Sequence, residues 1–137
     1  MTPDVFADIM DRAYIQMRPW SAATIAETIS NAHTVFLTHP QGGLIAHIVA
    51  DECEVLAIAA DPDHQRQGIA SQLLEGLIAT ASQRDVTHIF LEVAAQNTAA
   101  RAFYKAKGFA PVGLRKAYYT LRDGSKDDAV LLSRSVP

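Results

Sequence analysis

Glu92, Asn97 and Tyr104 have side chains that could transfer a proton or hold a polar ligand. Glu92 interrupts the apolar run at 89–93, where a carboxylate is costly to bury unless it is paired or faces a cavity. Asn97 and Tyr104 are seven residues apart, so they share one helix face with the small Ala100 between them. Each also has an ordinary explanation: a solvated strand end, a helix N-cap and a packing tyrosine. Their common face favours a ligand-binding function.

Residues 61–71 join an apolar run to a helical pattern and contain a candidate phosphate-binding turn. The first N–H groups of a helix have no partner within it, and the helix dipole adds about half a positive charge, so phosphate is favoured there. Gly68 and Ala70 let a ligand approach the backbone, and Arg66 adds a cation. The spacing Gln65-x-x-Gly68-x-Ala70 is neither a Walker loop nor a three-glycine dinucleotide fingerprint. A tight turn without a ligand is the alternative.

Hydrophobic periodicity indicates which elements position these residues. Residues 54–60 and 87–93 are expected to be strands covered on both faces, and residues 40–43 have the composition of a turn. The predicted order begins with a helix from Pro3 that ends before Pro19, a helix capped by Ser21, and a hairpin of 34–39 and 44–50. Strand 54–60 follows, then a helix of about four turns from Gly68 and strand 87–93. The chain then forms a helix from Asn97 to 107 and the extended segments 109–121 and 129–133. This order indicates an α/β (α+β) fold, a mixed sheet with helices on both faces.

Composition limits the protein classes that fit. A chain of 137 residues, 49% hydrophobic and 20% charged, suits one globular domain spanning 1–137. Its net charge of -3 lacks the basic excess of a nucleic-acid-binding protein. The lone Cys53 is expected to be a buried apolar residue in a reducing compartment. No apolar run reaches the roughly 18 residues of a membrane span, and the scattered histidines predict no metal site. With no leader evident, we expect a cytoplasmic protein.

The turn at 65–70, set between a strand and a helix, resembles the acyl-CoA-binding turn of the GNAT acetyltransferase superfamily. From Pro19 onward the chain resembles in particular the bacterial ribosomal-protein-alanine N-acetyltransferases of the RimI group. The residues that carry this likeness are Pro19-Trp20-Ser21, Asp61-Pro62-Asp63, Gln65-Arg66-Gln67-Gly68, Leu91-Glu92-Val93, Asn97, Ala102-Phe103-Tyr104, Gly108-Phe109, Arg115, Tyr118-Tyr119 and Asp123-Gly124.

The resemblance implies a GNAT fold with a mostly antiparallel sheet, and an acetyl-CoA-dependent N-acetyltransferase. Glu92 is then the general base, acting directly or through water, and Tyr104 the general acid for the departing thiolate. The pyrophosphate is expected on the turn and the first helical residues, and the pantetheine arm along the preceding strand. The implied acetyl-CoA-binding positions are Ile58, Ala59, Ala60, Arg66, Gln67, Gly68, Ile69, Ala70, Ser71 and Asn97. Ala70 replaces a frequent glycine, and Ser71 a common basic residue, so one phosphate contact is expected to be missing.

The expected acceptor is a primary amine, and the resemblance implies a protein N-terminus, that of a ribosomal protein. An α-amine has a pKa of about 7.7–8.0 against about 10.4 for lysine, so a modest base deprotonates it more easily. We expect Trp20, Tyr118 and Tyr119 near the acceptor. An acidic surface either attracts a basic peptide or is simply solvated; its residues are Asp51, Glu52 and Glu54.

Other functions fit parts of the same pattern. A direct transfer in a ternary complex needs neither a metal nor a cysteine nucleophile. The nearest alternative is a GNAT enzyme that acetylates a small-molecule amine. A catalytically silent acyl-CoA-binding module is less consistent with an intact Glu92 and Tyr104. A nucleotide-binding domain lacks the glycines or lysine of its motif.

Overall fold

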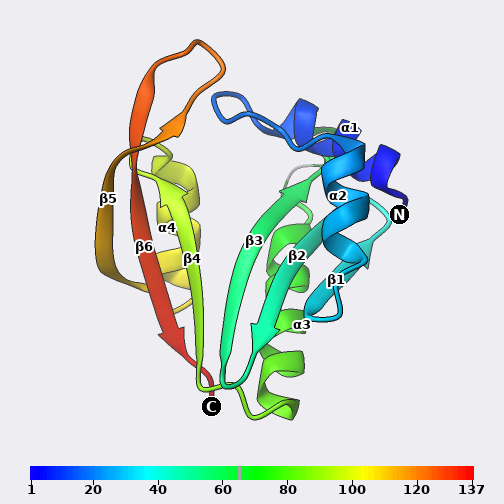
Figure 1. The fold of residues 1–137 in the computed structure, drawn as a ribbon, viewed down its shortest axis with the longest axis vertical. Coiled ribbons are helices and arrows are strands. Elements are labelled where there is room, and N and C mark those ends of the chain that lie inside the picture. Colours follow the sequence, from blue (N-terminus) through cyan, green and yellow to red (C-terminus); the bar gives the residue numbers. More distant parts are fainter. Residues whose placement is uncertain (65) are drawn as a thin grey trace.

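The computed structural model describes residues 1–64 and 66–137, and Gln65, the first residue of the predicted turn pattern, lies outside them. The elements in chain order are α1 (Pro3–Ala13), α2 (Ala22–Ile29), β1 (Thr34–His39), β2 (Gly42–Val49), β3 (Glu52–Ala60), the short 3-10 turn η1 (Pro62–His64), α3 (Ile69–Gln83), β4 (His88–Ala94), α4 (Thr98–Ala106), β5 (Ala110–Thr120) and β6 (Lys126–Ser135). Figure 1 shows their arrangement. The predicted order of elements is confirmed, although the first helix ends well short of Pro19.

The strands among these residues form one sheet in the order β1-β2-β3-β4-β6-β5, in which the β3–β4 pairing alone is parallel. Helices cover both faces (Figure 1). On one face, α1 and α2 pack over β1, β2 and β3 around the fully buried Phe6 and Met10. On the other face, α3 and α4 enclose a larger core around Leu74 and Ile89. The predicted mixed, mostly antiparallel sheet with helices on both faces is confirmed.

The helix starts divide into capped and uncapped ones. Thr2, Ser21 and Asn97 each place a side-chain oxygen on a backbone N–H of the first turn, at 3.2, 3.1 and 3.1 Å. This is the usual N-cap contact, and it satisfies one of the free donors of the helix. The helix α3 differs, because its N-cap Gly68 supplies no side-chain hydrogen bond and has a φ of 72°. Among residues 1–64 and 66–137, no side chain caps the first turn of α3, so its N–H groups are candidates for another partner.

The glycines at 42 and 43 do not form the turn that was predicted at 40–43. β2 already begins at Gly42, which pairs with Ala60 of β3. A Cβ on Gly42 would lie 2.7 Å from the Ala59 carbonyl oxygen, and one on Gly43 would lie 3.0 Å from the Phe6 ring. Close packing against β3 and α1 therefore requires glycine at both positions. In the sequence, two adjacent glycines after a proline look the same as a turn, so the tertiary reason could not be recognised.

The strands β3 and β4 pair only over their first halves. The parallel register runs from Glu52–His88 to Val55–Leu91, and beyond it the strands separate (Figure 1). The β2–β3 register shifts next to Ile45, and such a bulge bends and twists a strand. Before the shift, buried β3 side chains face the α3 core, and after it Ala57 and Ala59 face α1. The expectation that both faces are covered holds for the second half of β3, where Ala57 and Ala59 pack under α1 and Ile58 and Ala60 pack against the α3 core. It fails for the first half of β3 and for β4, along which buried side chains alternate with exposed or partly exposed ones.

The buried thiol of Cys53 agrees with the prediction of an apolar, unreactive cysteine. It is fully buried on β3, and burial raises its pKa to about 11, so the thiolate is scarce at neutral pH. The helices formed by residues 1–64 and 66–137 include none that is long and apolar enough to cross a bilayer. These same residues bring together no group of three His, Cys, Asp or Glu side chains that could hold a metal ion.

Candidate active site

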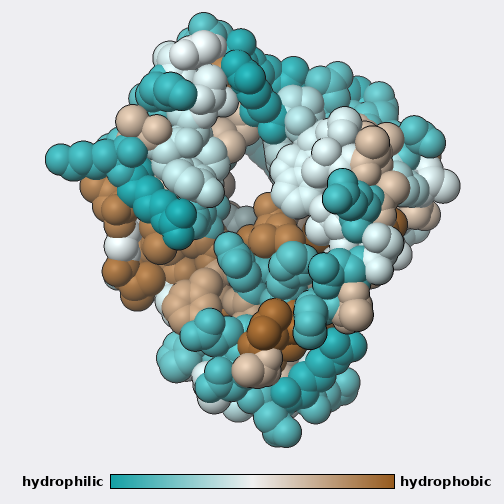
Figure 2. Space-filling view, viewed as in Figure 1, coloured by the Kyte–Doolittle hydropathy of each residue, from teal (hydrophilic) through white to brown (hydrophobic). Residues whose placement is uncertain are grey.

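A cavity of about 490 Å³ lies where β3 and β4 separate. Its walls come from the ends of both strands, the start of α4, the loop after α1, and Tyr119 of β5. Figure 2 shows an opening between β3 and β4 that passes through the molecule, with hydrophobic side chains gathered below it. Two ligands can therefore reach this cavity from opposite faces of the sheet.

Glu92 on β4 faces this cavity with one carboxylate oxygen free. Its side chain is 17% exposed, and Oε1 lies 3.4 Å from Nε of Arg115 on β5. The other oxygen, Oε2, is buried and has no hydrogen-bond partner among the described residues. A buried hydrogen-bond acceptor without a partner is costly, and a ligand that donates a hydrogen bond to this oxygen would satisfy it. Glu92 also lines a second cavity of about 370 Å³, which extends past Glu52 and Glu54 of β3.

Tyr104 on α4 supplies a protonated hydroxyl to the same cavity. The ring is buried between Phe103 and Phe109, with edge-to-face contacts at centroid distances of 5.2 and 5.6 Å. Burial raises its pKa to about 12, because the phenolate would lose its hydration. The hydroxyl therefore remains a proton donor at neutral pH.

Asn97 and Ala100 line the cavity beside Tyr104, as the predicted common helix face requires. The Asn97 side-chain oxygen accepts from the Ala100 N–H, so it caps the helix, and the amide NH₂ is the group left to meet a ligand. The structure thus brings Ile58, Glu92, Asn97 and Tyr104 together on one set of walls.

The predicted pyrophosphate turn lies after the end of β3, beyond the cavity lining. Arg66, Gln67 and Gly68 are exposed, and a Cβ added to Gly68 would meet no atom of the described residues within 4 Å. The side chain of Ile69 belongs to the α3 core, so only its backbone N–H is available to a ligand, while Ala70 and Ser71 are partly buried. The side chains of Ala59 and Ala60 pack under α1 and against the α3 core.

Tyr14 is a site residue that the sequence reasoning missed. Its hydroxyl donates to the Ile58 carbonyl at 2.9 Å, and burial raises its pKa above the ordinary range. One polar group of β3 in the gap is therefore already satisfied by Tyr14. A signal was present, because Tyr14 follows Phe6 and Met10 at a spacing of four residues and so extends the apolar stripe of α1.

A second missed feature joins the loop after α1 to the turn between β5 and β6. The Arg122 N–H donates to the Gln16 carbonyl at 2.9 Å, and its Nε donates to the Met17 carbonyl at 2.9 Å. Arg18 Nε in turn donates to the Leu121 carbonyl at 3.3 Å. These bonds close one side of the cavity. No local pattern could reveal them, because the partners are more than 100 residues apart in the chain.

Asp127 is a third missed residue, and it positions the start of α4. It is the buried charged side chain of β6, and its two oxygens accept the N–H groups of Gln96 and Asp128 at 3.0 and 2.8 Å. The segment before Asn97 is thereby attached to β6. A single aspartate at a strand start has no distinctive sequence signal.

The aromatic residues predicted near the acceptor divide. Trp20 and Tyr119 line the cavity, and burial raises the pKa of Tyr119 above its usual range. Tyr118 is 51% exposed and lies outside that lining, with the Arg115 guanidinium 5.1 Å from its ring. The structure therefore places Trp20 and Tyr119, and not Tyr118, on the wall of this cavity. The register shift between Arg115 and Tyr119 changes which tyrosine faces inward.

Residues 7–109 match the family described as the acetyltransferase (GNAT) family. Over 119 residues the chain is 38% identical to the ribosomal protein bS18-alanine N-acetyltransferase of Escherichia coli, covering 84% of this chain and 80% of that protein. It is 30% identical over 122 residues to N-alpha-acetyltransferase RimI of Mycobacterium tuberculosis, covering 82% and 75% of the two chains. The crystal structure of the E. coli ribosomal-protein-S18-alanine N-acetyltransferase superposes with a TM-score of 0.87 at 34% identity, over 98% of this chain and 87% of that one.

Proposed function

The chain belongs to the acetyltransferase (GNAT) family and is an N-acetyltransferase, and we propose that it moves an acetyl group from acetyl-CoA to the α-amine of a protein N-terminus. Enzymes of this family use acetyl-CoA as the donor. The observation that carries the proposal is the opening between β3 and β4, with Glu92 and Tyr104 on its walls. Two substrates can meet there from opposite faces, as a direct transfer in a ternary complex requires.

The donor is assigned to the turn before α3 and to the gap beside β3. The uncapped N–H groups of the first turn of α3 and the exposed Arg66 suit a pyrophosphate, and the open space at Gly68 allows its approach. The N–H of Ile58 is directed to the same side as its carbonyl, which meets Tyr14 in the gap. This N–H is the candidate donor to the pantetheine arm or to the thioester oxygen. Asn97 would contact an amide of the arm.

Glu92 and Tyr104 divide the proton transfers. The neutral amine attacks the thioester carbonyl carbon through its nitrogen lone pair, and the Glu92 carboxylate accepts, directly or through one water, the proton that the nitrogen loses as the C–N bond forms. A C–N bond forms and the C–S bond breaks. Tyr104 donates its proton to the sulfur, so the leaving group departs as a thiol. The free Glu92 oxygen and the raised pKa of Tyr104 are the states that these roles need.

The acceptor is proposed to be a protein chain beginning with alanine, and specifically a ribosomal protein in the cytoplasm. The E. coli relative, at 38% identity, is a ribosomal protein bS18-alanine N-acetyltransferase, and the M. tuberculosis relative, at 30% identity, is an N-alpha-acetyltransferase. The lower pKa of an α-amine suits a glutamate base. Glu52 and Glu54 line the second cavity beside Glu92, where they would attract a basic peptide, whereas Asp51 lies outside that lining.

The acceptor class is tested with a matched pair of peptides and acetyl-CoA. One short basic peptide begins with a free alanine, and the other has the same sequence with a blocked α-amine and a free lysine. Mass spectrometry should show acetylation of the first peptide and not of the second. Equal rates on both peptides, or activity on small amines alone, would contradict the proposal and favour an enzyme for small-molecule amines.

A further inference from the structure

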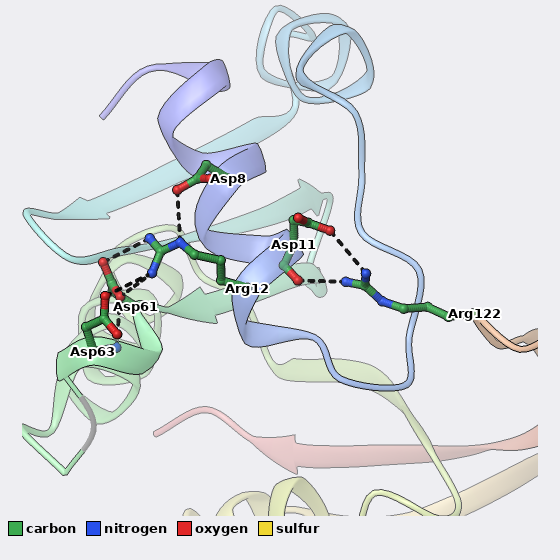
Figure 3. A network of polar contacts seen from close by, with 6 residues as sticks. All are labelled: Asp8, Asp11, Arg12, Asp61, Asp63 and Arg122. Atoms are coloured by element: carbon green, nitrogen blue, oxygen red, sulfur yellow. Dashed lines mark hydrogen bonds and ion pairs between the residues drawn. The ribbon is translucent and has the colours of Figure 1, made fainter.

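The last turn of α1 lies between the regions assigned to the two substrates. On one side, Arg12 contacts the segment 61–63 that leads into the pyrophosphate turn. On the other side, Asp11 contacts Arg122 in the turn between β5 and β6. Figure 3 shows that these neighbouring side chains point in opposite directions. One helical turn therefore contacts both the donor side and the acceptor side.

The contact on the donor side is a paired one. Arg12 Nη1 donates to Oδ1 of Asp61 at 2.7 Å, and Nη2 donates to Oδ2 at 3.1 Å. The Asp63 carboxylate lies 3.4 Å from Nη1, and the Asp63 N–H donates to Asp61 at 2.9 Å. The hydrogen bonds of Arg12 hold the pKa of Asp61 at about 2, so this carboxylate stays charged. Arg12 therefore fixes the segment before the pyrophosphate turn relative to α1.

The contact on the acceptor side holds the loop that lines the cavity. Arg122 Nη1 donates to Oδ1 of Asp11 at 3.1 Å, and Nη2 donates to the Asp11 carbonyl at 2.7 Å. The same guanidinium reaches the Met17 carbonyl through Nε, at 2.9 Å. Arg122 thus attaches both ends of the segment 11–17 to the turn between β5 and β6, and residues 13–17 lie on the cavity wall.

We propose that Arg12 and Arg122 are positioning residues that couple the two substrate sites, so that bound acetyl-CoA raises the affinity for the acceptor peptide. Exposed ion pairs contribute little to the free energy of unfolding, so we infer that this network serves to position the two chain segments that it joins to α1. A pyrophosphate that fixes the turn also restricts Arg12, and through α1 it restricts the loop that the acceptor must order. The acceptor must raise the affinity for the donor by the same factor, because coupling is reciprocal. This inference rests on the proposed function.

Calorimetry measures the coupling without turnover when CoA replaces acetyl-CoA. The dissociation constant of CoA is measured with and without a saturating peptide that begins with alanine. We expect the peptide to tighten CoA binding by about fivefold or more in the wild-type protein. In Arg12→Ala and in Arg122→Ala the ratio should fall close to one, and in Arg12→Lys, which keeps the charge but loses the fork, it should be intermediate.

The matched control is Glu75→Gln, which removes another exposed ion pair, the contact of Glu75 with Lys107 at 3.6 Å. It should keep the wild-type ratio, and thermal melting should show that each variant is folded. If Arg122→Ala does not fold, Arg12→Ala decides. A ratio of one in the wild-type protein, or a wild-type ratio in the arginine variants, would overturn the inference. A wild-type enzyme that does not acetylate the peptide would instead overturn the proposed acceptor.

Discussion

Burial gives Tyr104 a pKa of about 12, and the ring is held between two phenylalanines on the cavity wall. Glu92 has the complementary property, a carboxylate oxygen that is buried without a partner among the described residues. Either feature alone would fit an ordinary explanation, a packing tyrosine or a carboxylate at a strand end. Their presence on the same cavity is what supports an acid and a base.

Replacing Tyr104 by phenylalanine removes the proposed acid and keeps the ring. We expect kcat to fall by about 10²–10⁴-fold, the usual cost of losing a positioned acid. The dissociation constant of acetyl-CoA should change little, because the packing persists. Stopped-time acetylation assays and calorimetry measure the two quantities. The control is Tyr118→Phe, the same chemical change at an exposed site, which should turn over normally.

Glu92→Gln tests the base in the same assays. A direct role predicts a loss comparable to that of Tyr104→Phe, and a role through water predicts a smaller one. Wild-type turnover in both variants, on an acceptor that the enzyme does acetylate, would show that the assigned roles are wrong.

The pH profile follows from the same pKa shift. kcat/KM for a peptide should rise as its α-amine loses a proton, near a pKa of about 7.7–8.0, and then stay level to about pH 10. Tyr104 stays protonated over that range because its pKa is about 12. Because folding raises the pKa of Tyr104, its contribution to the free energy of unfolding is complete below the ordinary pKa of 10.0 and is lost as the pH rises toward 12. Initial rates at constant ionic strength measure the profile, and a decline beginning below pH 9 would contradict it.

The helix α3 begins without a side-chain cap, unlike the other α-helices among the described residues. In Gly68→Val the new side chain would project into the space where the pyrophosphate is expected. We expect acetyl-CoA affinity to fall by about tenfold, equivalent to about 1.4 kcal/mol, the size of one hydrogen bond to a charged group. Titration calorimetry measures the loss.

Gly124→Val is the matched control for this prediction. Gly124 has a φ of 84°, close to that of Gly68, and its Cβ would also meet no atom within 4 Å. Both variants should therefore lose similar stability, about 1–2 kcal/mol from the left-handed conformation. Equal acetyl-CoA affinity in folded Gly68→Val and the wild-type protein would remove the turn from the proposed site.

Elements whose signals are local could be predicted. Ser21 and Asn97 cap the helices they were expected to cap, because capping depends on a contact within three residues. Gly42 was misassigned to a turn because its true constraint, the carbonyl of Ala59, lies on another strand. The apolar run at 54–60 did not reveal which side chains of β3 are buried and which are partly exposed, because the residues of this strand that line the cavity are apolar as well.

The molecule as a whole contains features that no local pattern specifies. Helical spacing was enough to place Asn97 and Tyr104 on one face, and the family resemblance supplied their roles. The closure of the cavity by Arg122 depends on the Met17 carbonyl, which lies 105 residues away in the chain. A register shift in β5 decides that Tyr119, and not Tyr118, lines the cavity, and the sequence did not separate the two tyrosines. Such contacts follow from how the layers assemble.

Because β3 and β4 pair over only four residues each, the backbone amides of these strands should differ in their protection from hydrogen–deuterium exchange. In the free protein, the Ile58 amide should exchange much faster than amides of the β2–β3 ladder, since β4 has already diverged. If the pantetheine arm bonds this edge, CoA should slow that one amide while the ladder amides stay as they were. Residue-resolved exchange by NMR measures this, and equal rates at Ile58 with and without CoA would contradict it. The ligand would then act as a missing strand, completing a sheet that the chain leaves open.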